Sequence, residues 1–301
     1  MEKLLFTISI PTYNRKELLE RNLNHLEKIN FDINKFEVIV VDDGSNDGTD
    51  NFISDFIKKS LLNIKYIKKE NGGKFTALNI AINEAKGYFF INCDSDDYLD
   101  NDCLTNICEI WETIDLKNIA GIIGQNLNLN SKTNEIIGDL FPSDIQYSDP
   151  IEMRFIHKIK GDKFPCILST VLKEFKFPDN DNTHFIPESY IFYGISTKYQ
   201  FKYSNTIFKH SEYLADGITN SIQKYRLENA YGCYLVYEKY IMHYSPRKTL
   251  MGYTRNYINY VRFSFHSGQK KHQMQRAFDY FLFPAGYLAF LIDNFKIKIN
   301  K

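Results

Sequence analysis

The chain has 301 residues, of which 44% are hydrophobic and 25% are charged, and these proportions are typical of a folded globular protein. This length suffices for one large domain or two modest ones. Because 37 Lys and Arg residues balance 37 Asp and Glu residues, no net charge attracts a polyanion, and we expect no nucleic-acid partner.

The five cysteines and the N-terminus indicate where the protein works. The cysteines are scattered without a C-x-x-C pair, which argues against a disulfide framework or a zinc site and fits a reducing cytosol. The chain passes from Met1 into an apolar run without a basic leader, so we expect no secretion signal. No stretch reaches the ~18 uninterrupted apolar residues that a membrane-spanning helix needs. These features predict a cytoplasmic protein.

Short apolar runs alternate with helical patterns in the first part of the chain. The predicted strands cover residues 4–10, 36–41, 64–68 and 88–92. The first predicted helix begins near Asn14, and two more cover residues 50–59 and 76–86. This alternation predicts an α/β fold with a mostly parallel sheet that carries helices on both faces.

The pattern also predicts helix ends and faces. Asn14 should cap the first helix with Glu17 three residues later, and the buried stripe should be Leu19, Leu23 and Leu26. The second helix should carry Phe52, Phe56 and Ile57 on one face. Gly87 should end the third helix as its C′ residue.

The rest of the chain divides into two parts. Residues from about 115 to 216 combine short strands, prolines and Asn/Asp-rich turns, which we interpret as the second half of the same domain. From about residue 220 the chain turns helical and rich in Tyr and Phe. We therefore predict a domain of residues 1–219, with halves 1–114 and 115–219, and a C-terminal helical region of residues 220–301.

Four polar clusters lie at the strand ends or in neighbouring loops. They are Pro11-Thr12-Tyr13-Asn14, Asp42-Asp43-Gly44-Ser45, Asn71-Gly72-Gly73-Lys74 and Asp94-Ser95-Asp96-Asp97. Ligands of open α/β sheets bind beyond the carboxyl ends of the strands, so the clusters point at one pocket. Carboxylates, an aromatic ring, glycines and a lysine suit a nucleotide diphosphate and a divalent metal.

Asp94 and Asp96 are the candidate metal ligands. Alternate residues just past a strand can present two carboxylates to one side, and oxygen ligands suit Mg²⁺ or Mn²⁺. The alternative is a polar turn in which Asp97 or Asp100 caps the next helix. The stretch after Asp43 is not a calcium loop, because position twelve is Ser54 and not Glu.

The other clusters each allow a binding role and a structural one. Asp43 could accept a hydrogen bond from a base or a ribose, or belong to a turn that caps the next helix. Tyr13 could stack on a base or simply pack. The cluster ending in Lys74 could approach a phosphate or form a flexible turn, but it lacks the spacing of a P-loop.

The order of the clusters is that of a known family. The series runs through Pro11-Thr12-Tyr13-Asn14-Arg15, Val41-Asp42-Asp43-Gly44-Ser45, Asn71-Gly72-Gly73-Lys74, Ala85-Lys86-Gly87 and Asp94-Ser95-Asp96-Asp97. Over residues 3–110 it closely resembles the family-2 glycosyltransferases. The resemblance implies a GT-A fold and an inverting enzyme that takes a sugar from a nucleotide-sugar, here a UDP-sugar. It also implies a Mn²⁺ or Mg²⁺ cofactor and a role in bacterial surface polysaccharide.

The resemblance assigns the base pocket. It implies that Pro11, Thr12 and Tyr13 line this pocket and that Tyr13 stacks on uracil. Asp43 would contact the uracil or the ribose, with Asp42 as the alternative.

The resemblance also assigns the diphosphate side. Lys74 would lie near the base or the phosphates, Asp94 would bind on the ribose side together with Ser95, and Asp96 would bind the metal. His210 and the stretch from Asp216 to Asn220 look like segments near the diphosphate in related enzymes. His210 is therefore a candidate metal or phosphate contact, or an ordinary partly exposed histidine.

Inversion needs a general base for the acceptor hydroxyl. In the family this is the Asp of a Glu-Asp pair, but here Ser189 follows Glu188. Glu188 is our predicted base; the alternatives are Asp179, Asp181 or weakened catalysis.

The apolar stretch 281–292 is interrupted by Pro284 and Gly286, and basic residues including Lys270, Lys271, Lys296 and Lys301 flank it. It fits an interfacial helix at the inner face of the cell membrane, which implies peripheral association. It equally fits a helix that packs in the core or forms a homo-oligomer.

The predicted function is therefore transfer of a sugar to a glycan, lipid-linked or polymer acceptor. A nucleotidyltransferase of related fold would need a Gly-rich basic loop after the first strand, where this chain has Pro11-Thr12-Tyr13-Asn14. A catalytically inactive nucleotide- or glycan-binding protein finds support only in Ser189, while Asp94 and Asp96 weigh against it.

Overall fold

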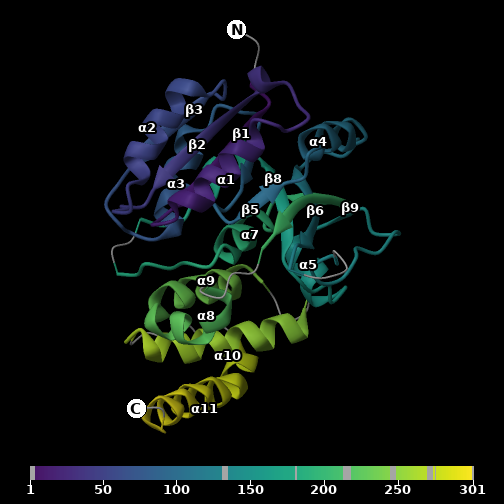
Figure 1. Ribbon diagram of the computed structural model, residues 1–301. Helices are drawn as coiled ribbons and strands as arrows, with labels where there is room; N and C mark the ends of the chain where they lie inside the picture. The colour runs from purple at the N-terminus through teal and green to yellow at the C-terminus, as the bar shows by residue number, and fades with distance from the viewer. Residues whose placement is uncertain are drawn as a thin grey trace.

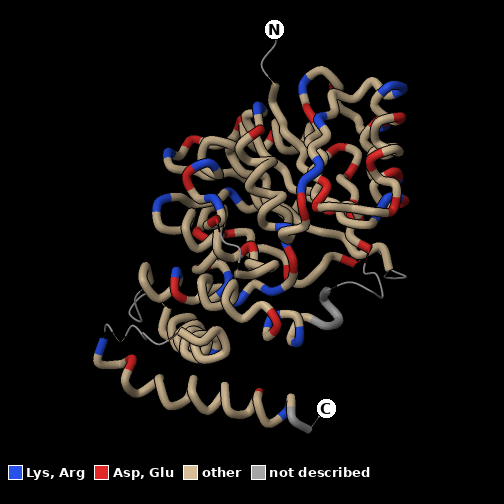
Figure 2. Tube along the Cα trace, turned by 90° about the vertical axis from the view of Figure 1, so that its left-hand side faces the viewer, with Lys and Arg blue, Asp and Glu red and all other residues tan. Residues whose placement is uncertain are grey.

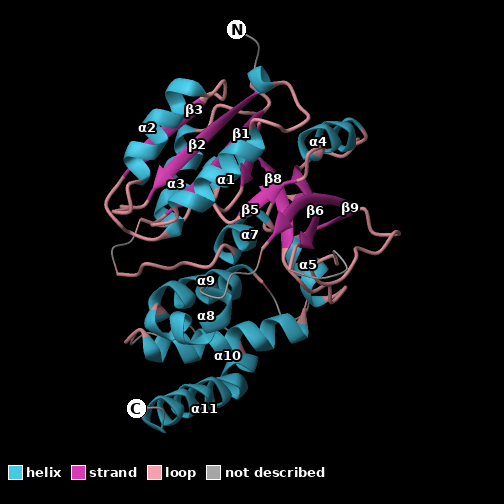
Figure 3. Ribbon diagram, in the orientation of Figure 1, coloured by secondary structure: helices cyan, strands magenta, loops and turns pink. Residues whose placement is uncertain are grey.

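A computed structural model describes residues 4–130, 135–179, 182–212, 218–244, 249–269, 274 and 276–299. A sheet flanked by helices forms one part of the described molecule, and a stack of longer helices lies beneath it (Figures 1 and 3). The strands are β1 Phe6–Thr12, β2 Phe36–Asp42, β3 Ile64–Lys68, β4 Phe89–Asn92, β5 Asp97–Leu99, β6 Ile119–Asn128, β7 Tyr147–Ser148, β8 Lys163–Leu168 and β9 Gln200–Ser211. The helices near the sheet are α1 Lys16–Leu26, α2 Thr49–Lys59, α3 Lys74–Glu84, α4 Cys103–Glu112, α5 Pro150–Phe155, α6 Ser169–Glu174 and α7 Ser189–Ile195, with a 3₁₀ turn at Ile33–Lys35.

The sheet has the strand order β3-β2-β1-β4-β8-β6-β9-β5, and β7 pairs with β9. The strands from β3 to β4 are all parallel, whereas β8 pairs antiparallel with both β4 and β6. Every residue of β1 and β2 is buried, because α1, α2 and α4 pack on one face of the sheet and α3, α6 and α7 on the other. The predicted α/β fold is confirmed, and its parallel part is the part that the sequence predicted strand by strand.

The first helix shows one correct and one wrong prediction. Leu19, Leu23 and Leu26 are buried, as expected. Asn14 is not the N-cap, because α1 starts one residue later and its N-cap is Arg15. The Asn14 side chain instead accepts a hydrogen bond from the backbone N–H of Asn46 at 2.9 Å. It therefore joins the loop after β1 to the loop after β2.

The faces and ends of the next two helices also differ in part. In α2 the fully buried residue is Ile53, with Phe52 and Phe56 beside it, whereas Ile57 is exposed. Gly87 is not a C′ residue with positive φ, since α3 ends with Ala85 as its C-cap. A Cβ on Gly87 would lie 2.3 Å from the backbone of Phe6, so this glycine is needed for close approach to β1.

The C-terminal region is helical, as predicted. Its helices are α8 Ile218–Glu228, α9 Ala230–His243, α10 Leu250–His266 and α11 Ala277–Ile299. Its core is rich in tyrosine: the side chains that are completely buried there include Tyr240, Tyr253, Tyr257 and Tyr260. Stacked rings contribute to this core: Tyr234 of α9 stacks on Tyr260 of α10, Tyr240 on Tyr244 at the end of α9, and Tyr253 on Tyr257 within α10.

The last helix, α11, packs on α10 with one face only. Asp293 accepts hydrogen bonds from Arg262 and lies 2.9 Å from His266 Nε2. Phe281, Leu288 and Phe295 are exposed on the other face, and Figure 2 shows few charged residues along this helix. Within the described residues, none of the helices combines the length and the apolar character needed to cross a bilayer.

Candidate functional site

Hydrogen bonds join the four predicted clusters into one ring at the edge of the sheet. Asn14 N–H donates to Ser45 Oγ at 2.8 Å, which joins the first cluster to the second. The backbone N–H of Gly73 donates to Asp43 Oδ2 at 2.8 Å and joins the second to the third. The structure therefore brings together the four clusters, which are separate in the sequence. Ion pairs of Lys74 with Asp94 and of Arg15 with Asp96 close the ring.

The third and fourth clusters meet through Lys74, the first residue of α3. Its Nζ lies 2.7 Å from Asp94 Oδ2 and 2.7 Å from Glu188 Oε1. Desolvation lowers the pKa of Lys74, but the charges of Asp94 and Glu188 outweigh it and raise the pKa above its ordinary value. Lys74 thus stays protonated and holds a carboxylate from the first half of the chain beside one from the second half.

Asp94, Asp96 and Asp97 form a group of carboxylates whose oxygens lie within 4.8 Å of one another. Arg15 donates to Asp96 at 2.7 Å. Asp94 and Asp96 keep part of their surface exposed, whereas Asp97 is buried. Oxygen donors at this spacing fit a hard divalent cation. Asp94 and Asp96 are the members of the group that solvent and a ligand can reach.

Asp97 has a different role, which the sequence did not indicate. It does not cap α4, whose N-cap is Asp102, but forms a buried ion pair with Lys209 of β9. Burial lowers the pKa of Lys209, but the charges of Asp97 and Asp162 raise it above its ordinary value. This pair anchors β5 to β9 beneath the other two carboxylates.

Asp42 and Asp43 organise the turns around them. Asp42 is completely buried and accepts hydrogen bonds from Ser45 N–H and from the hydroxyl of Tyr66, each at 2.7 Å. Asp43 accepts from the N–H of Gly72 and Gly73, at 3.0 and 2.8 Å. Both carboxylates therefore fix the turns of the second and third clusters.

Lys69 also pairs with Asp43, at 2.6 Å, and only 7% of the Asp43 side chain is exposed. No sequence pattern singles out Lys69, because it directly follows β3, which already contains Lys65 and Lys68.

The first cluster offers both a ring and a free polar atom. Tyr13 is 48% exposed, so its ring is accessible. The hydroxyl of Thr12 is buried and has no hydrogen-bond partner among the described residues. Pro11 is buried as part of β1, and Ser95 is buried beside Asp94. A buried hydroxyl without a partner is suited to a ligand that brings the missing hydrogen bond.

In the described part of the chain, the side chains of His210 and Asp179 make no hydrogen bond or ion pair with the four clusters. His210 Nε2 lies 2.9 Å from Asp100 Oδ2, and His210 is not a member of the carboxylate group. Asp179 is exposed, and Asp181 lies outside the described residues. Asp216 and Gly217 of the predicted diphosphate segment also lie outside them, as do Lys270, Lys271 and Lys301 of the tail.

Arg15, Lys69, Lys209 and Asp162 are neighbours of the site that the sequence analysis did not single out. Arg15 follows the first cluster directly, so its position was a usable signal. Lys209 and Asp162 come from β9 and the residue before β8, and only tertiary structure places them there.

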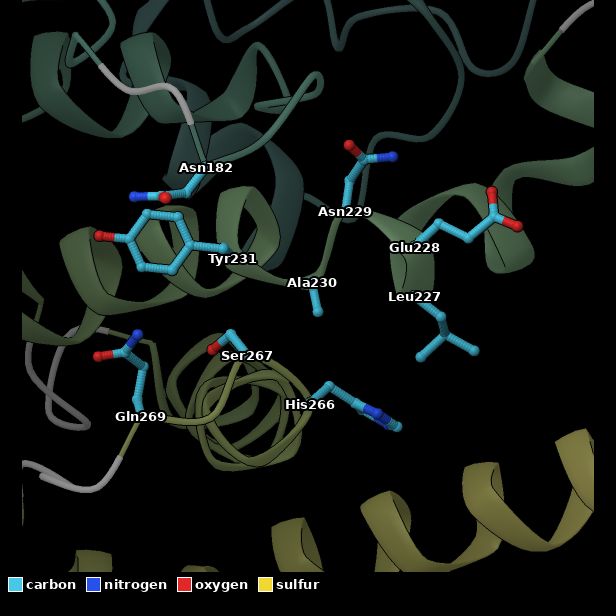
Figure 4. Close-up of a pocket in the computed structure, with 9 residues that line it drawn as sticks. All are labelled: Asn182, Leu227, Glu228, Asn229, Ala230, Tyr231, His266, Ser267 and Gln269. Carbon is cyan, nitrogen blue, oxygen red and sulfur yellow. The ribbon is translucent and has the colours of Figure 1, made fainter.

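A separate hollow of about 490 Å³ lies among the C-terminal helices. Residues of the α8–α9 turn, the end of α10 and Asn182 line it (Figure 4). None of these residues belongs to the four clusters, so the hollow is not the predicted nucleotide pocket.

Comparison with known proteins shows the family. Residues 7–158, half of the chain, match the family described as glycosyl transferase family 2. The chain belongs to this family. The matched residues include all four clusters, whereas Glu188 lies beyond them.

This chain spans only a part of the length of the curated relatives that it matches. Poly(ribitol-phosphate) beta-N-acetylglucosaminyltransferase TarS of Staphylococcus aureus is 35% identical over 99 residues, which are 33% of this chain and 17% of TarS. The uncharacterized glycosyltransferase MG025 of Mycoplasma genitalium is 34% identical over 111 residues, which are 36% of this chain and 37% of MG025.

Solved structures show the fold over nearly the whole chain. Residues 1–349 of S. aureus TarS, in complex with UDP-GlcNAc, match with a TM-score of 0.60 at 17% identity and cover 94% of this chain and 79% of that one. The mannosyltransferase PcManGT from Pyrobaculum calidifontis, in complex with GDP-Man and Mn²⁺, matches with a TM-score of 0.57 at 16% identity, covering 96% and 87%. The predicted GT-A architecture with a C-terminal helical region is thereby confirmed.

Proposed function

We propose that this glycosyltransferase is an inverting enzyme that moves a sugar from a UDP-sugar to a glycan, lipid-linked or polymer acceptor. The observation that carries the proposal is the pair of 2.7 Å contacts of Lys74 with Asp94 and Glu188. They set a carboxylate of the donor side next to the only candidate base that the described structure brings to the site. The UDP-GlcNAc in the TarS complex supports a uridine donor.

The first two clusters would bind the nucleoside. Tyr13, with its exposed ring, would stack on the uracil, and Thr12 would supply its unpartnered hydroxyl. Pro11, Asp42 and Asp43 would shape the base pocket, because the two carboxylates fix the surrounding turns. On the other side of the pocket, Asp94 and Ser95 would contact the ribose.

Asp94 and Asp96 would hold a Mn²⁺ or Mg²⁺ ion. Their oxygens lie within the 4.8 Å group, and both side chains are accessible. When bound, such an ion neutralises the charge that develops on the departing diphosphate. The Mn²⁺ of the PcManGT complex supports this assignment, and Arg15 and Lys74 are the cations beside it.

Glu188 would act as the general base. Its carboxylate takes the proton of an acceptor hydroxyl while the acceptor oxygen attacks the anomeric carbon of the sugar from the face opposite the diphosphate. The bond from that carbon to the phosphate oxygen breaks, and its electron pair leaves with UDP. The diphosphate would compete with Glu188 for Lys74, so donor binding would free the base.

The relatives and the tail suggest the setting of the reaction. TarS is named as a poly(ribitol-phosphate) glycosyltransferase, which supports a surface polymer as acceptor and a role in polysaccharide biosynthesis. The exposed apolar face of α11 supports peripheral association with the inner face of the membrane, or with a second copy of the chain. Both settings are compatible with a cytoplasmic site of synthesis.

The substitution Glu188→Gln tests the proposal directly. Gln keeps the shape and the hydrogen-bond acceptor but cannot take a proton, so UDP release from UDP-GlcNAc with poly(ribitol phosphate) should fall by about 100-fold or more. UDP affinity, measured by calorimetry, should stay near the wild-type value.

The matched control is Glu84→Gln, which removes another lysine-paired glutamate, far from the site on α3. It should leave both measurements unchanged. Transfer by Glu188→Gln at a rate within about threefold of wild type would show that the base lies elsewhere.

A further inference from the structure

The loop of residues 182–187 leads to Glu188. Two glycines from distant parts of the chain pack closely against the backbone of this loop. Gly73 has φ +92°, and a Cβ there would lie 1.9 Å from the carbonyl oxygen of His184. One residue further along the loop, a Cβ on Gly232 of α9 would lie 1.9 Å from the carbonyl oxygen of Phe185. No side chain fits at either distance, so both contacts require glycine.

Asn229 lies in the turn between α8 and α9 (Figure 4), and its side chain binds the same loop. Its Oδ1 accepts from the N–H of His184 at 3.1 Å and from the hydroxyl of Thr183 at 3.3 Å. Its Nδ2 donates to the carbonyl of Tyr225 in α8 at 3.0 Å. One amide therefore ties the loop to the end of a helix.

The loop also touches the donor side of the site. Gly73 N–H donates to Asp43 at 2.8 Å, and the next residue is Lys74, which pairs with Glu188. The ring of Phe185 lies 5.0 Å from that of Tyr225, between centroids. A continuous set of contacts thus runs from the end of β2 through this loop to the C-terminal helices.

We propose that Gly73, Gly232 and Asn229 are positioning residues that fix residues 182–187 and so hold Glu188 beside Lys74. The C-terminal helices then set the geometry of the reaction as well as the stability of the fold. This inference rests on the proposed role of Glu188 as the base. We expect the loss of these contacts to lower the rate strongly, because misplacing a catalytic group by ~1 Å can cost about 100-fold in rate.

The test compares Gly232→Ala, Asn229→Ala and Asn229→Asp with the control Gly252→Ala. Gly252 is a helical glycine whose Cβ would lie 2.8 Å from the ring of Phe155 and from the Tyr240 hydroxyl, away from the loop. Three quantities are measured: hydrogen exchange of the amides of residues 182–186, UDP affinity by calorimetry, and UDP release from UDP-GlcNAc with water or poly(ribitol phosphate).

Gly232→Ala and Asn229→Ala should speed exchange in residues 182–186 and lower kcat by about tenfold or more, with UDP affinity within about threefold of wild type. Asn229→Asp keeps an oxygen that accepts from His184 and Thr183, so it should restore most of the rate. Gly252→Ala should lower thermal stability without changing loop exchange or kcat.

Unchanged loop exchange in Gly232→Ala and Asn229→Ala would overturn the inference, and so would faster exchange with an unchanged kcat. Equal loss of kcat in Gly252→Ala would also overturn it, because the effect would then be one of stability. If Glu188→Gln keeps its activity, or wild type releases no UDP, the proposed function fails, and exchange alone decides whether the loop is held.

Discussion

At the scale of single residues, the site is organised by cations that stand between carboxylates. Lys74 separates Asp94 from Glu188, Arg15 contacts Asp96, and Lys209 lies under the group through Asp97. Such cations allow the acidic groups to lie close together, where like charges would otherwise repel. A diphosphate, being anionic, can replace a carboxylate as the partner of Lys74 or Arg15.

Lys74→Met should therefore damage both halves of the reaction. Without the ammonium, Asp94 and Glu188 repel and the diphosphate loses a partner, so we expect UDP affinity to fall by about tenfold and kcat by about 100-fold. Calorimetry and UDP release from UDP-GlcNAc measure the two effects.

Lys74→Arg is the matched variant, since the guanidinium keeps the charge and should preserve UDP affinity within about threefold. Wild-type UDP affinity and rate in Lys74→Met would contradict a role for this residue in binding or positioning.

Residue types and order predicted which side chains gather at the sheet edge, because strand ends of a parallel sheet must meet there. They could not predict that Lys209 of β9 pairs with Asp97 and Asp162, because no local sequence pattern marks a buried lysine in a strand. They also could not show that Asp43 is already bonded to the N–H groups of the glycine turn.

At the scale of elements, the packing of α7 against α9 determines where Glu188 lies, because Glu188 is the N-cap residue of α7. Lys239 of α9 places its Nζ 3.7 Å from the centre of the Tyr190 ring in α7. Desolvation lowers the pKa of Lys239 from 10.5 to about 8. The folded protein therefore carries a cation that its surroundings disfavour.

Lys239→Met should stabilise the protein, by an amount that depends on pH. Burial penalises the charged form, and the ring contact offsets part of that penalty; because the side chain is also partly exposed and screened by solvent, the gain at pH 7 should be about 1 kcal/mol. Below pH 8 the lysine is charged in both states and the folded state bears the full penalty. Above pH 8 the folded state loses the proton first, so the gain should shrink and vanish near pH 10.5.

Chemical denaturation at several pH values measures this gain. Lys198→Met is the control, because Lys198 is exposed and lies 5.5 Å from the Phe175 ring. A gain that is independent of pH would show that the charge of Lys239 is not the cause.

Local pattern predicted the elements of the first half and the helical nature of the tail, since each has a clear period. It was wrong about Ile57, which is exposed, because tertiary contacts decide which face of a helix is buried to within one residue. It was also wrong about Asn14, because the side chain accepts a hydrogen bond from a neighbouring loop and does not cap the helix. The pairing of β6, β8 and β9 has long sequence separations and mixed direction, so no local signal encodes it.

At the scale of the whole molecule, the division into residues 1–114, 115–219 and 220–301 remains our prediction. The contacts of Asn229 and Gly232 with residues 183–185 link the last region closely to the second. We propose that residues 220–301 act as a structural extension of the glycosyltransferase domain that supports the candidate base and carries the exposed face of α11.

The central claim is that Asp94 and Asp96 bind a metal and a uridine diphosphate together. The measurement that tests it most directly is a calorimetric titration of UDP with and without Mn²⁺, on wild type, Asp96→Ala and the surface control Asp55→Ala. We expect Mn²⁺ to tighten UDP binding at least about tenfold in wild type and in Asp55→Ala, and Asp96→Ala to lose that gain. Equal UDP affinity with and without the metal, or in wild type and Asp96→Ala, would contradict the account.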